Sequence, residues 1–276
     1  MKKTAITGAE GFFGSRLAAH FATSLGQEFE VLPFSRKDFD INNSTEVLAS
    51  FQKHTPDYVI HSAALADTRA CEANPALSYA VNFEGSANIA RACLSICAKM
   101  IFISSDQVYI RPGGVGPFAE DSPIITSNLY ASHKKAAEDF ILETLPDAVI
   151  LRFPWLYDAP ENGKKTSSNI LTNILSALET GEPITAPAFE FRSLASVSYL
   201  ISQFPALINL PAGIYNVGTE NDLSTYDFYC KIASEVVNMN QDQIDALIQK
   251  DCERYKEQTR DFRMSMKKLR ENLISH

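Results

Sequence analysis

A tyrosine and a lysine four residues apart mark the segment NLYASHKKAAEDFIL, residues 128–142. Its apolar spacing predicts a helix, on which Tyr130 and Lys134 share one face. An ammonium group beside a phenol favours the phenolate, so we expect Lys134 to lower the pKa of Tyr130 from its usual value of about 10. Tyr130 would then donate a proton to a carbonyl group at neutral pH. Taken alone, the pair has a simpler interpretation, a chance meeting of an aromatic residue and a lysine.

Hydroxyl and carboxyl groups end an apolar strand predicted at residues 99–105, where the sequence reads KMIFISSDQVY. They place Ser104, Ser105 and Asp106 at the carboxyl edge of a parallel sheet, where open α/β folds bind ligands. A serine hydroxyl there would hydrogen-bond the substrate oxygen that Tyr130 protonates and stabilise the charge that develops on it.

Three glycines, Gly8, Gly11 and Gly14, follow an apolar strand and precede a helical pattern in the sequence TAITGAEGFFGS. In a dinucleotide-binding turn the first glycine permits a sharp bend, the second lets the backbone approach a pyrophosphate, and the third lets helix and strand pack closely. Backbone amides at the start of the helix then face the anion. We therefore expect a nucleotide cofactor, and a glycine-rich turn without a ligand is the alternative.

The end of the second predicted strand, about 20 residues after the glycine turn, indicates which nucleotide binds. An acidic residue at that point binds the ribose 2'-hydroxyl of NAD, whereas this sequence reads PFSRKDFD. A serine hydroxyl beside a guanidinium suits a 2'-phosphate, so Ser35 and Arg36 predict NADP. The alternative, which keeps NAD possible, is that Arg36 is solvated and Asp38 holds the ribose.

These side chains require a frame of alternating strands and helices. Apolar strands are predicted at residues 3–7, 28–34, 57–63, 99–105 and 147–153. Amphipathic helices lie between them, and the longest spans 76–97, just after Pro75. Such alternation is typical of a parallel sheet covered on both faces. The sequence therefore predicts an α/β fold, a doubly wound parallel (Rossmann) sheet with a smaller C-terminal substrate-binding lobe.

The pattern changes after residue 157. A polar loop at 158–168, which we expect to be mobile, precedes short strands such as 213–218 and helices such as 225–237. We therefore predict a dinucleotide-binding Rossmann domain at 1–157 and a mainly substrate-binding lobe at 158–276. Part of 190–218 is expected to return to the first domain.

Composition excludes several other classes of protein. The 276 residues are 45% hydrophobic with a net charge of -8, which indicates a soluble globular protein without a basic surface for nucleic acid or anionic lipid. No run approaches the roughly 20 apolar residues of a membrane helix. The five cysteines are odd in number and lack the close pairs of a zinc site, so we expect reduced thiols in the cytoplasm and no metal site.

Three features together resemble one enzyme family: T-G-x-x-G-x-x-G at the first turn, a serine closing the fourth strand, and Y-x-x-x-K on the next helix. They are similar to the extended short-chain dehydrogenase/reductase family. Within it, residues 1–157 resemble the dTDP-4-dehydrorhamnose reductases, through segments such as SSDQVY, LYASHKKAAED and LRFPWLYD. The resemblance implies an NAD(P)-dependent oxidoreductase that transfers hydride to the keto group of a nucleotide-linked sugar.

The resemblance also implies roles for individual residues. The catalytic residues would be Ser105, Tyr130 and Lys134, with Tyr130 as the acid and Lys134 as its partner and a ligand of the nicotinamide ribose. The backbone of Gly11, Phe12 and Phe13 would contact the pyrophosphate of the cofactor. Asp40 and Ile41 would contact the adenine, and Ala63 and Ala64 would form a wall facing the cofactor.

Four residues are candidates for binding the sugar nucleotide: Asp106, Gln107, Trp155 and Arg192. Related dehydratases carry Asp-Glu after the strand-end hydroxyl, and a carboxamide at 107 cannot take up a proton, so reduction is favoured over dehydration. Gln107 either hydrogen-bonds a sugar hydroxyl or faces solvent. Arg192 either clasps a nucleotide diphosphate or forms a surface salt bridge, and Trp155 either lines the sugar pocket or packs.

Two further functions stay open. One is a sugar-nucleotide epimerase that returns the hydride to its bound substrate. The other is a non-catalytic NADP-binding regulatory subunit like the methionine adenosyltransferase beta subunit. Ala131 and His133 replace the glycine and serine usual in the rhamnose pattern, which weakens the choice of substrate. The resemblance also allows a homodimer.

Overall fold

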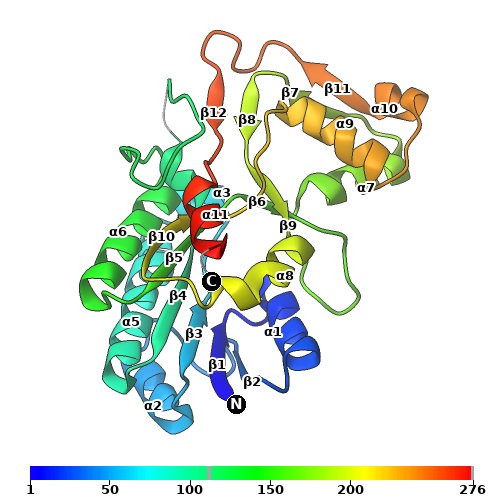
Figure 1. Ribbon diagram of the computed structural model, residues 1–276. Helices are drawn as coiled ribbons and strands as arrows, with labels where there is room; N and C mark the ends of the chain where they lie inside the picture. The colour runs from blue at the N-terminus through cyan, green and yellow to red at the C-terminus, as the bar shows by residue number, and fades with distance from the viewer. Residues whose placement is uncertain (111–112, 275–276) are drawn as a thin grey trace.

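A six-stranded parallel sheet forms the centre of the protein in a computed structural model that describes residues 1–110 and 113–274 (Figure 1). The strand order is β10-β5-β4-β3-β1-β2. The strands are β1 Lys2–Thr7, β2 Phe29–Phe34, β3 Tyr58–His61, β4 Lys99–Ser105, β5 Val149–Phe153 and β10 Gly213–Asn216. The predicted α/β fold with a doubly wound parallel sheet is confirmed.

The strand order reverses between β1 and β3. β1 and β3 pair with each other. The chain passes from β1 to β2 on one side of this pair and from β3 to β4 on the other side. In open parallel sheets a ligand crevice forms beyond the carboxyl ends of the strands at such a reversal. The glycine turn after β1 and the residues after β3 therefore lie at the expected crevice.

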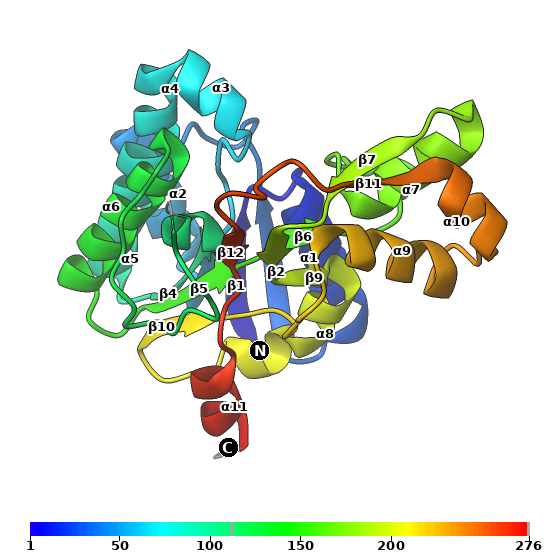
Figure 2. The same ribbon diagram turned by 90° about the horizontal axis from the view of Figure 1, so that it is seen from above.

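Helices cover both faces of this sheet, as Figure 2 shows from above. One face is covered by α1 Phe12–Ser24, α8 Val197–Leu207 and α11 Lys267–Ile274, and the other by α2 Ser44–His54, α5 Gly85–Ile96 and α6 Leu129–Thr144. Neighbouring strand residues alternate between the two cores, with Ile6 in the first and Ala5 in the second. Burial on both faces explains why these strands read as continuous apolar runs.

The helix predicted at 76–97 is continuous but not uniform. It comprises α4 Pro75–Tyr79, a π-helical turn at Ala80–Glu84, and α5. Asn74 accepts a hydrogen bond from the Leu77 amide and caps α4, which begins at Pro75 as expected. A short helix, α3 Thr68–Ala73, precedes it.

A second, smaller core lies away from the large sheet. It is built by α7 Ile170–Thr180, α9 Thr225–Glu235, α10 Gln241–Leu247, β7 Ile184–Pro187 and β11 Ile248–Asp251. Two further strand pairs connect it to the sheet: β8 Glu190–Arg192 with β12 Arg260–Phe262, and β6 Trp155–Tyr157 with β9 Leu194–Ser196. Strand β10, from the segment predicted at 213–218, pairs with β5 and so joins the large sheet rather than this lobe.

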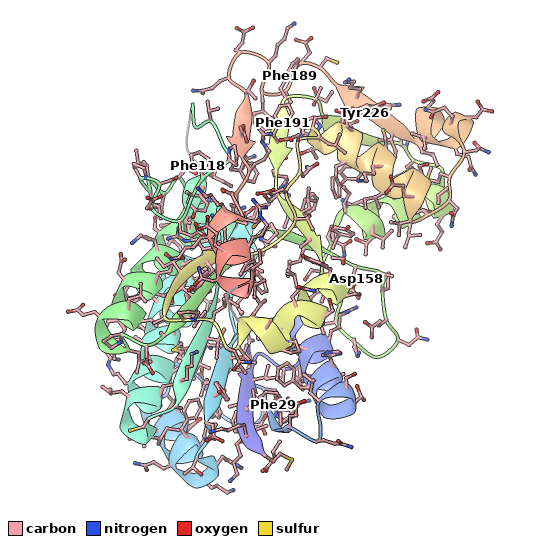
Figure 3. All side chains as sticks on the ribbon, in the orientation of Figure 1. Phe29, Phe118, Asp158, Phe189, Phe191 and Tyr226 are labelled. Atoms are coloured by element: carbon pink, nitrogen blue, oxygen red, sulfur yellow. The ribbon has the colours of Figure 1, made fainter. Side chains whose placement is uncertain are left out.

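The polar loop after β6 is tied to the Rossmann helices, which its composition did not predict. The buried Arg16 of α1 donates hydrogen bonds to the carbonyl oxygens of Ala159 (3.2 Å) and Lys165 (3.0 Å) and pairs with Glu161 at 2.8 Å. Asp158, labelled in Figure 3, accepts hydrogen bonds from the amide and hydroxyl of Ser198 at the start of α8. In the described part of the chain no helix is long and apolar enough to cross a membrane.

Candidate active site

The glycine turn joins β1 to α1 at the reversal of strand order. Gly8 has a φ of +71°, and a Cβ on it would lie 2.8 Å from the amide nitrogen of Ala63. A Cβ on Gly14 would collide with the carbonyl oxygen of Gly8. These two glycines are therefore needed for the fold itself. Gly11 caps α1 without a side-chain hydrogen bond, which leaves the amides of the first turn for an anion.

Residues 12 and 13 present their backbone at this first turn while their rings pack. Phe13 is buried between α1 and the sheet, 5.1 Å from Phe153 between ring centroids. The ring of Phe12 lies 4.6 Å from the guanidinium carbon of Arg16. The ring contacts hold the start of α1 in place, and the backbone there fits a pyrophosphate group.

The candidates at the end of β2 differ in how far they are already engaged. One carboxylate oxygen of Asp38 accepts hydrogen bonds from the amide (2.7 Å) and hydroxyl (3.0 Å) of Ser35. Lys37 pairs with Glu10 at 2.7 Å. Arg36 is exposed and has no hydrogen bond or ion pair within residues 1–110 and 113–274. The side chain of Arg36 is therefore available to a phosphate, whereas Asp38 is held by its own turn.

The remaining cofactor candidates flank the crevice. Ala63 and Ala64 follow β3, and the backbone of Ala63 packs against Gly8. The carboxylate of Asp40 accepts a hydrogen bond from the Asn42 amide at 2.9 Å. Ile41 packs so closely on the helix start at Gly85 that a Cβ there would lie 2.7 Å from its Cδ1. The two sets lie after different strands, as a bound dinucleotide requires.

Ser105 and Tyr130 meet at the carboxyl edge of β4. Tyr130 lies in the first turn of α6, is buried, and is close enough to Ser105 for that side chain to affect its pKa. The Ser105 hydroxyl also donates to Asp106 and accepts from the amide of Gln107, each at 3.2 Å. Burial raises the pKa of Tyr130 above its usual value, while the neighbouring Ser105 hydroxyl acts in the opposite direction. The phenol is therefore protonated at neutral pH.

Lys134 lies one helical turn after Tyr130 but does not lower its pKa, contrary to the expectation from the sequence. Its ammonium group donates to the carbonyl oxygen of Ile103 at 2.6 Å and lies 3.8 Å from the ring centroid of Phe102. Burial lowers the pKa of Lys134 to about 7, and the charge of Glu138 acts in the opposite direction. The reason for the difference is that Lys134 is buried against β4, where its charge is costly.

A buried polar network beneath these residues was not predicted. Glu138, on the next turn of α6, accepts hydrogen bonds from Ser104 (2.5 Å) and from both Nε (3.0 Å) and Nη2 (2.7 Å) of Arg152. Arg152 also donates to the hydroxyl of Tyr109 (2.5 Å), which in turn donates to Asn216 (2.8 Å). An arginine inside the apolar strand VILRF was the available signal, because such a charge needs a buried partner.

Three of the four substrate candidates come together between the sheet and the smaller lobe. The guanidinium of Arg192 lies between the rings of Trp155 and Phe262, with its carbon 4.7 Å from each centroid. Its Nη2 lies 3.7 Å from the carboxylate of Asp106. Gln107 is the neighbour of Asp106, and its side-chain oxygen accepts a hydrogen bond from Asn128 at 3.4 Å.

One residue near Arg192, Glu190, was missed by the sequence analysis. Glu190 lies 3.9 Å from Nη1 of Arg192 and forms a 3.0 Å ion pair with Arg260. All of these side chains come from the β8 and β12 strands, whose pairing is not visible in short-range spacing. Among the described residues no group of three or more His, Cys, Asp or Glu side chains could hold a metal ion.

Comparison with known proteins places this geometry among sugar-nucleotide enzymes. The family model described as RmlD substrate binding domain matches residues 1–276. The spore coat polysaccharide biosynthesis protein SpsK of Bacillus subtilis is 28% identical over 235 residues, 85% of this chain and 80% of the relative. The dTDP-4-dehydrorhamnose reductase of Streptomyces griseus is 35% identical over 155 residues, 56% of this chain; the match spans 50% of that relative's length.

A solved structure gives the same result over the whole fold. The crystal structure of dTDP-4-dehydrorhamnose reductase from Bacillus anthracis in complex with NADP has a TM-score of 0.84 at 27% identity. The match covers 99% of this chain and 93% of that one. The resemblance inferred from the sequence is thereby confirmed. Since the family match runs from the first residue to the last, the chain belongs to the RmlD substrate-binding domain family, within the extended short-chain dehydrogenase/reductases.

Proposed function

We propose that this chain is an NADP-dependent reductase that acts on the keto group of a nucleotide-linked sugar, as its relatives named dTDP-4-dehydrorhamnose reductase do. The observation that carries the proposal is the proximity of the Ser105 hydroxyl to the buried phenol of Tyr130 at the carboxyl edge of β4. The names of these relatives favour a reductase over an epimerase or a regulatory subunit.

The roles of the residues follow from their protonation and position. Tyr130 donates its phenolic proton to the substrate oxygen, and its raised pKa keeps that proton in place until the substrate binds. When substrate binds, the Ser105 hydroxyl turns its one proton from Asp106 to the same oxygen and stabilises the negative charge that develops on it. Lys134, one turn along α6, lies at the base of the site, where its amino group donates to the carbonyl oxygen of Ile103. When bound, NADPH supplies the hydride.

The residues around the glycine turn fit the cofactor. The first-turn amides of α1 would face the pyrophosphate, and Asp40, Ile41, Ala63 and Ala64 would line the adenosine and the crevice. Arg36 would bind the 2'-phosphate, with Ser35 beside it. NAD stays possible as a second cofactor, since a solved relative, the enzyme WbmG of Bordetella bronchiseptica, is in complex with NAD.

The cofactor choice is tested at Arg36. Arg36→Ala is expected to raise the KM for NADPH about tenfold, because a charge-assisted hydrogen bond to phosphate is lost. The KM for NADH should not change, and Lys53→Ala on α2 serves as the control for removal of a surface cation. Equal changes for both cofactors would contradict a role in binding the 2'-phosphate.

The activity itself is tested by oxidation of NADPH with dTDP-4-dehydrorhamnose. Tyr130→Phe should lower kcat by about 10²- to 10⁴-fold, the usual contribution of a positioned acid, while NADPH still binds. Tyr199→Phe, an exposed tyrosine of α8, is the matched control. Unchanged turnover in Tyr130→Phe would remove that residue from the mechanism.

Assembly and location belong to the same proposal. A homodimer, a cytoplasmic location and the absence of nucleic acid partners follow from the resemblance and from the acidic composition. The division at residue 157 into a cofactor domain and a substrate lobe also remains a prediction. Size-exclusion chromatography with light scattering measures the oligomeric state directly, and a monomer at micromolar concentration would argue against the dimer.

A further inference from the structure

The Asp106 and Arg192 side chains form an incomplete pair inside the proposed active site. The nearest approach between them is 3.7 Å, from Nη2 of Arg192 to Oδ2 of Asp106, which is too long for a hydrogen bond. Oδ2 and the Nε of Arg192 are both buried, and neither has a hydrogen-bond partner within residues 1–110 and 113–274. Leaving such atoms unpaired is costly, so their arrangement points to a ligand.

The aromatic rings fix the position of the cation. Trp155 and Phe262 hold the Arg192 guanidinium between them, and its side chain is 13% exposed. Asp106 is 2% exposed, and its other carboxylate oxygen already accepts a hydrogen bond from Ser105. The acceptor and the donor are therefore both held in place, one directly after β4 and the other on strand β8.

The pair lies next to the reacting centre. Asp106 directly follows Ser105, and its charge acts on Tyr130. A substrate whose keto oxygen contacts Ser105 and Tyr130 would bring the neighbouring carbon of its ring to Asp106. The group bound there must donate to a carboxylate and accept from a guanidinium, which a hydroxyl does with its one proton and its lone pairs.

We propose that Asp106 and Arg192 together hold the sugar hydroxyl on the carbon beside the reduced keto carbon, a site we call the hydroxyl clamp. The hydroxyl donates to Oδ2 of Asp106 and accepts from Nε of Arg192. This inference rests on the proposed function and adds a substrate requirement, a free hydroxyl next to the ketone. Loss of a hydroxyl from a site built to bind it is discriminated far more strongly than loss of a methylene group.

The charges around Arg192 argue against its other interpretation, a contact with the nucleotide diphosphate. Asp106 and Glu190 lie on either side of the guanidinium, at 3.7 and 3.9 Å, and Arg260 is already paired with Glu190. A diphosphate placed against Arg192 would therefore meet two carboxylates. A neutral hydroxyl has no such repulsion.

The test uses dTDP-rhamnose and its 2-deoxy and 3-deoxy analogues, titrated by calorimetry into the NADP-loaded protein. The 3-deoxy analogue lacks the hydroxyl beside the reacting carbon and is expected to bind at least about tenfold more weakly, while the 2-deoxy analogue binds within about threefold of dTDP-rhamnose. In Asp106→Ala the penalty for the 3-deoxy analogue should vanish. Asp139→Ala, an exposed carboxylate of α6, is the matched control and should keep it.

Each outcome decides a separate point. Equal binding of all three ligands to the wild-type protein, or a penalty that persists in Asp106→Ala, would overturn the hydroxyl clamp alone. If Asp106→Ala does not fold, Arg192→Met is the second variant. It should also abolish the difference in affinity between dTDP-rhamnose and the 3-deoxy analogue. If dTDP-rhamnose does not bind to a protein that still binds NADP, the proposed substrate class fails, and this inference fails with it.

Discussion

Two buried carboxylate–arginine pairs lie near the end of β4, and they differ in how completely their polar atoms are paired. Glu138 and Arg152 form two hydrogen bonds with each other, at 2.7 and 3.0 Å, and Ser104 completes the carboxylate. Asp106 and Arg192 approach only to 3.7 Å and leave one acceptor and one donor without a partner in the described chain.

This difference indicates that the Glu138–Arg152 pair stabilises the fold, whereas the Asp106–Arg192 pair binds a ligand. A buried ion pair compensates its desolvation only when the geometry is good and the remaining polar atoms are satisfied. Glu138 and Arg152 meet that condition and join α6 to β5 beneath Lys134. Asp106 and Arg192 do not meet it, and a stable protein retains such a pair where binding requires it.

The largest effect is expected from breaking the closed pair. Glu138→Gln leaves Arg152 buried without a countercharge and should lower the free energy of unfolding by about 3 to 5 kcal/mol. Urea unfolding followed by circular dichroism measures this. Glu143→Gln, an exposed residue of the same helix, is the control and should change stability by less than about 0.5 kcal/mol. A loss below about 1 kcal/mol in Glu138→Gln would show that the pair is not structural.

An intermediate effect concerns the pH dependence that Lys134 adds above this pair. Its pKa of about 7 in the folded protein lies below the unfolded value of about 10.4. Between these two pH values the unfolded chain binds more protons, so the Lys134 contribution makes stability rise with pH, by up to about 1.4 kcal/mol per unit. As pH falls from about 10 toward 7, the cost of burying the Lys134 ammonium therefore lowers the free energy of unfolding.

The substitution Lys134→Met isolates the effect of Lys134 on the pH dependence of stability. In thermal unfolding measured between pH 7 and 10, the stability of this variant should rise less steeply than that of the wild-type protein. Lys135→Met, the more exposed neighbour on α6, should keep the wild-type slope. Parallel curves for the wild-type protein and Lys134→Met would mean that the lysine is charged when folded.

The smallest effect on stability is expected from the open pair. Burial raises the pKa of Asp106, although Arg192 acts in the opposite direction. Above the usual pKa of the carboxyl, the folded protein therefore binds the Asp106 proton more strongly than the unfolded chain does. The contribution of Asp106 to the free energy of unfolding falls as pH rises. Asp106→Asn removes this cost and should leave stability at pH 7 unchanged or higher by up to about 1 kcal/mol. A loss comparable to that of Glu138→Gln would make the two pairs alike and contradict the comparison.

Much of the cofactor half could be predicted from the sequence because its signals are local. Gly8, Gly11 and Gly14 stand within one turn, and each strand of the large sheet is a short apolar run. The four-residue spacing of Tyr130 and Lys134 follows directly from helical geometry. The direction of the Tyr130 pKa was wrong, because proximity along a helix does not reveal where an ammonium group points or how deeply a phenol is buried.

The sequence by itself therefore determined the order of strands and helices, the glycine turn and the residue types at the sheet edge, since each depends on conformations of neighbouring residues. Only the tertiary structure decided that Arg152 meets Glu138, that Arg16 fastens the loop after β6, and that Arg192 lies between Trp155 and Phe262 beside Asp106. The physical reason is that those contacts join segments separated by many residues. Burial and charge select them only after the chain has packed.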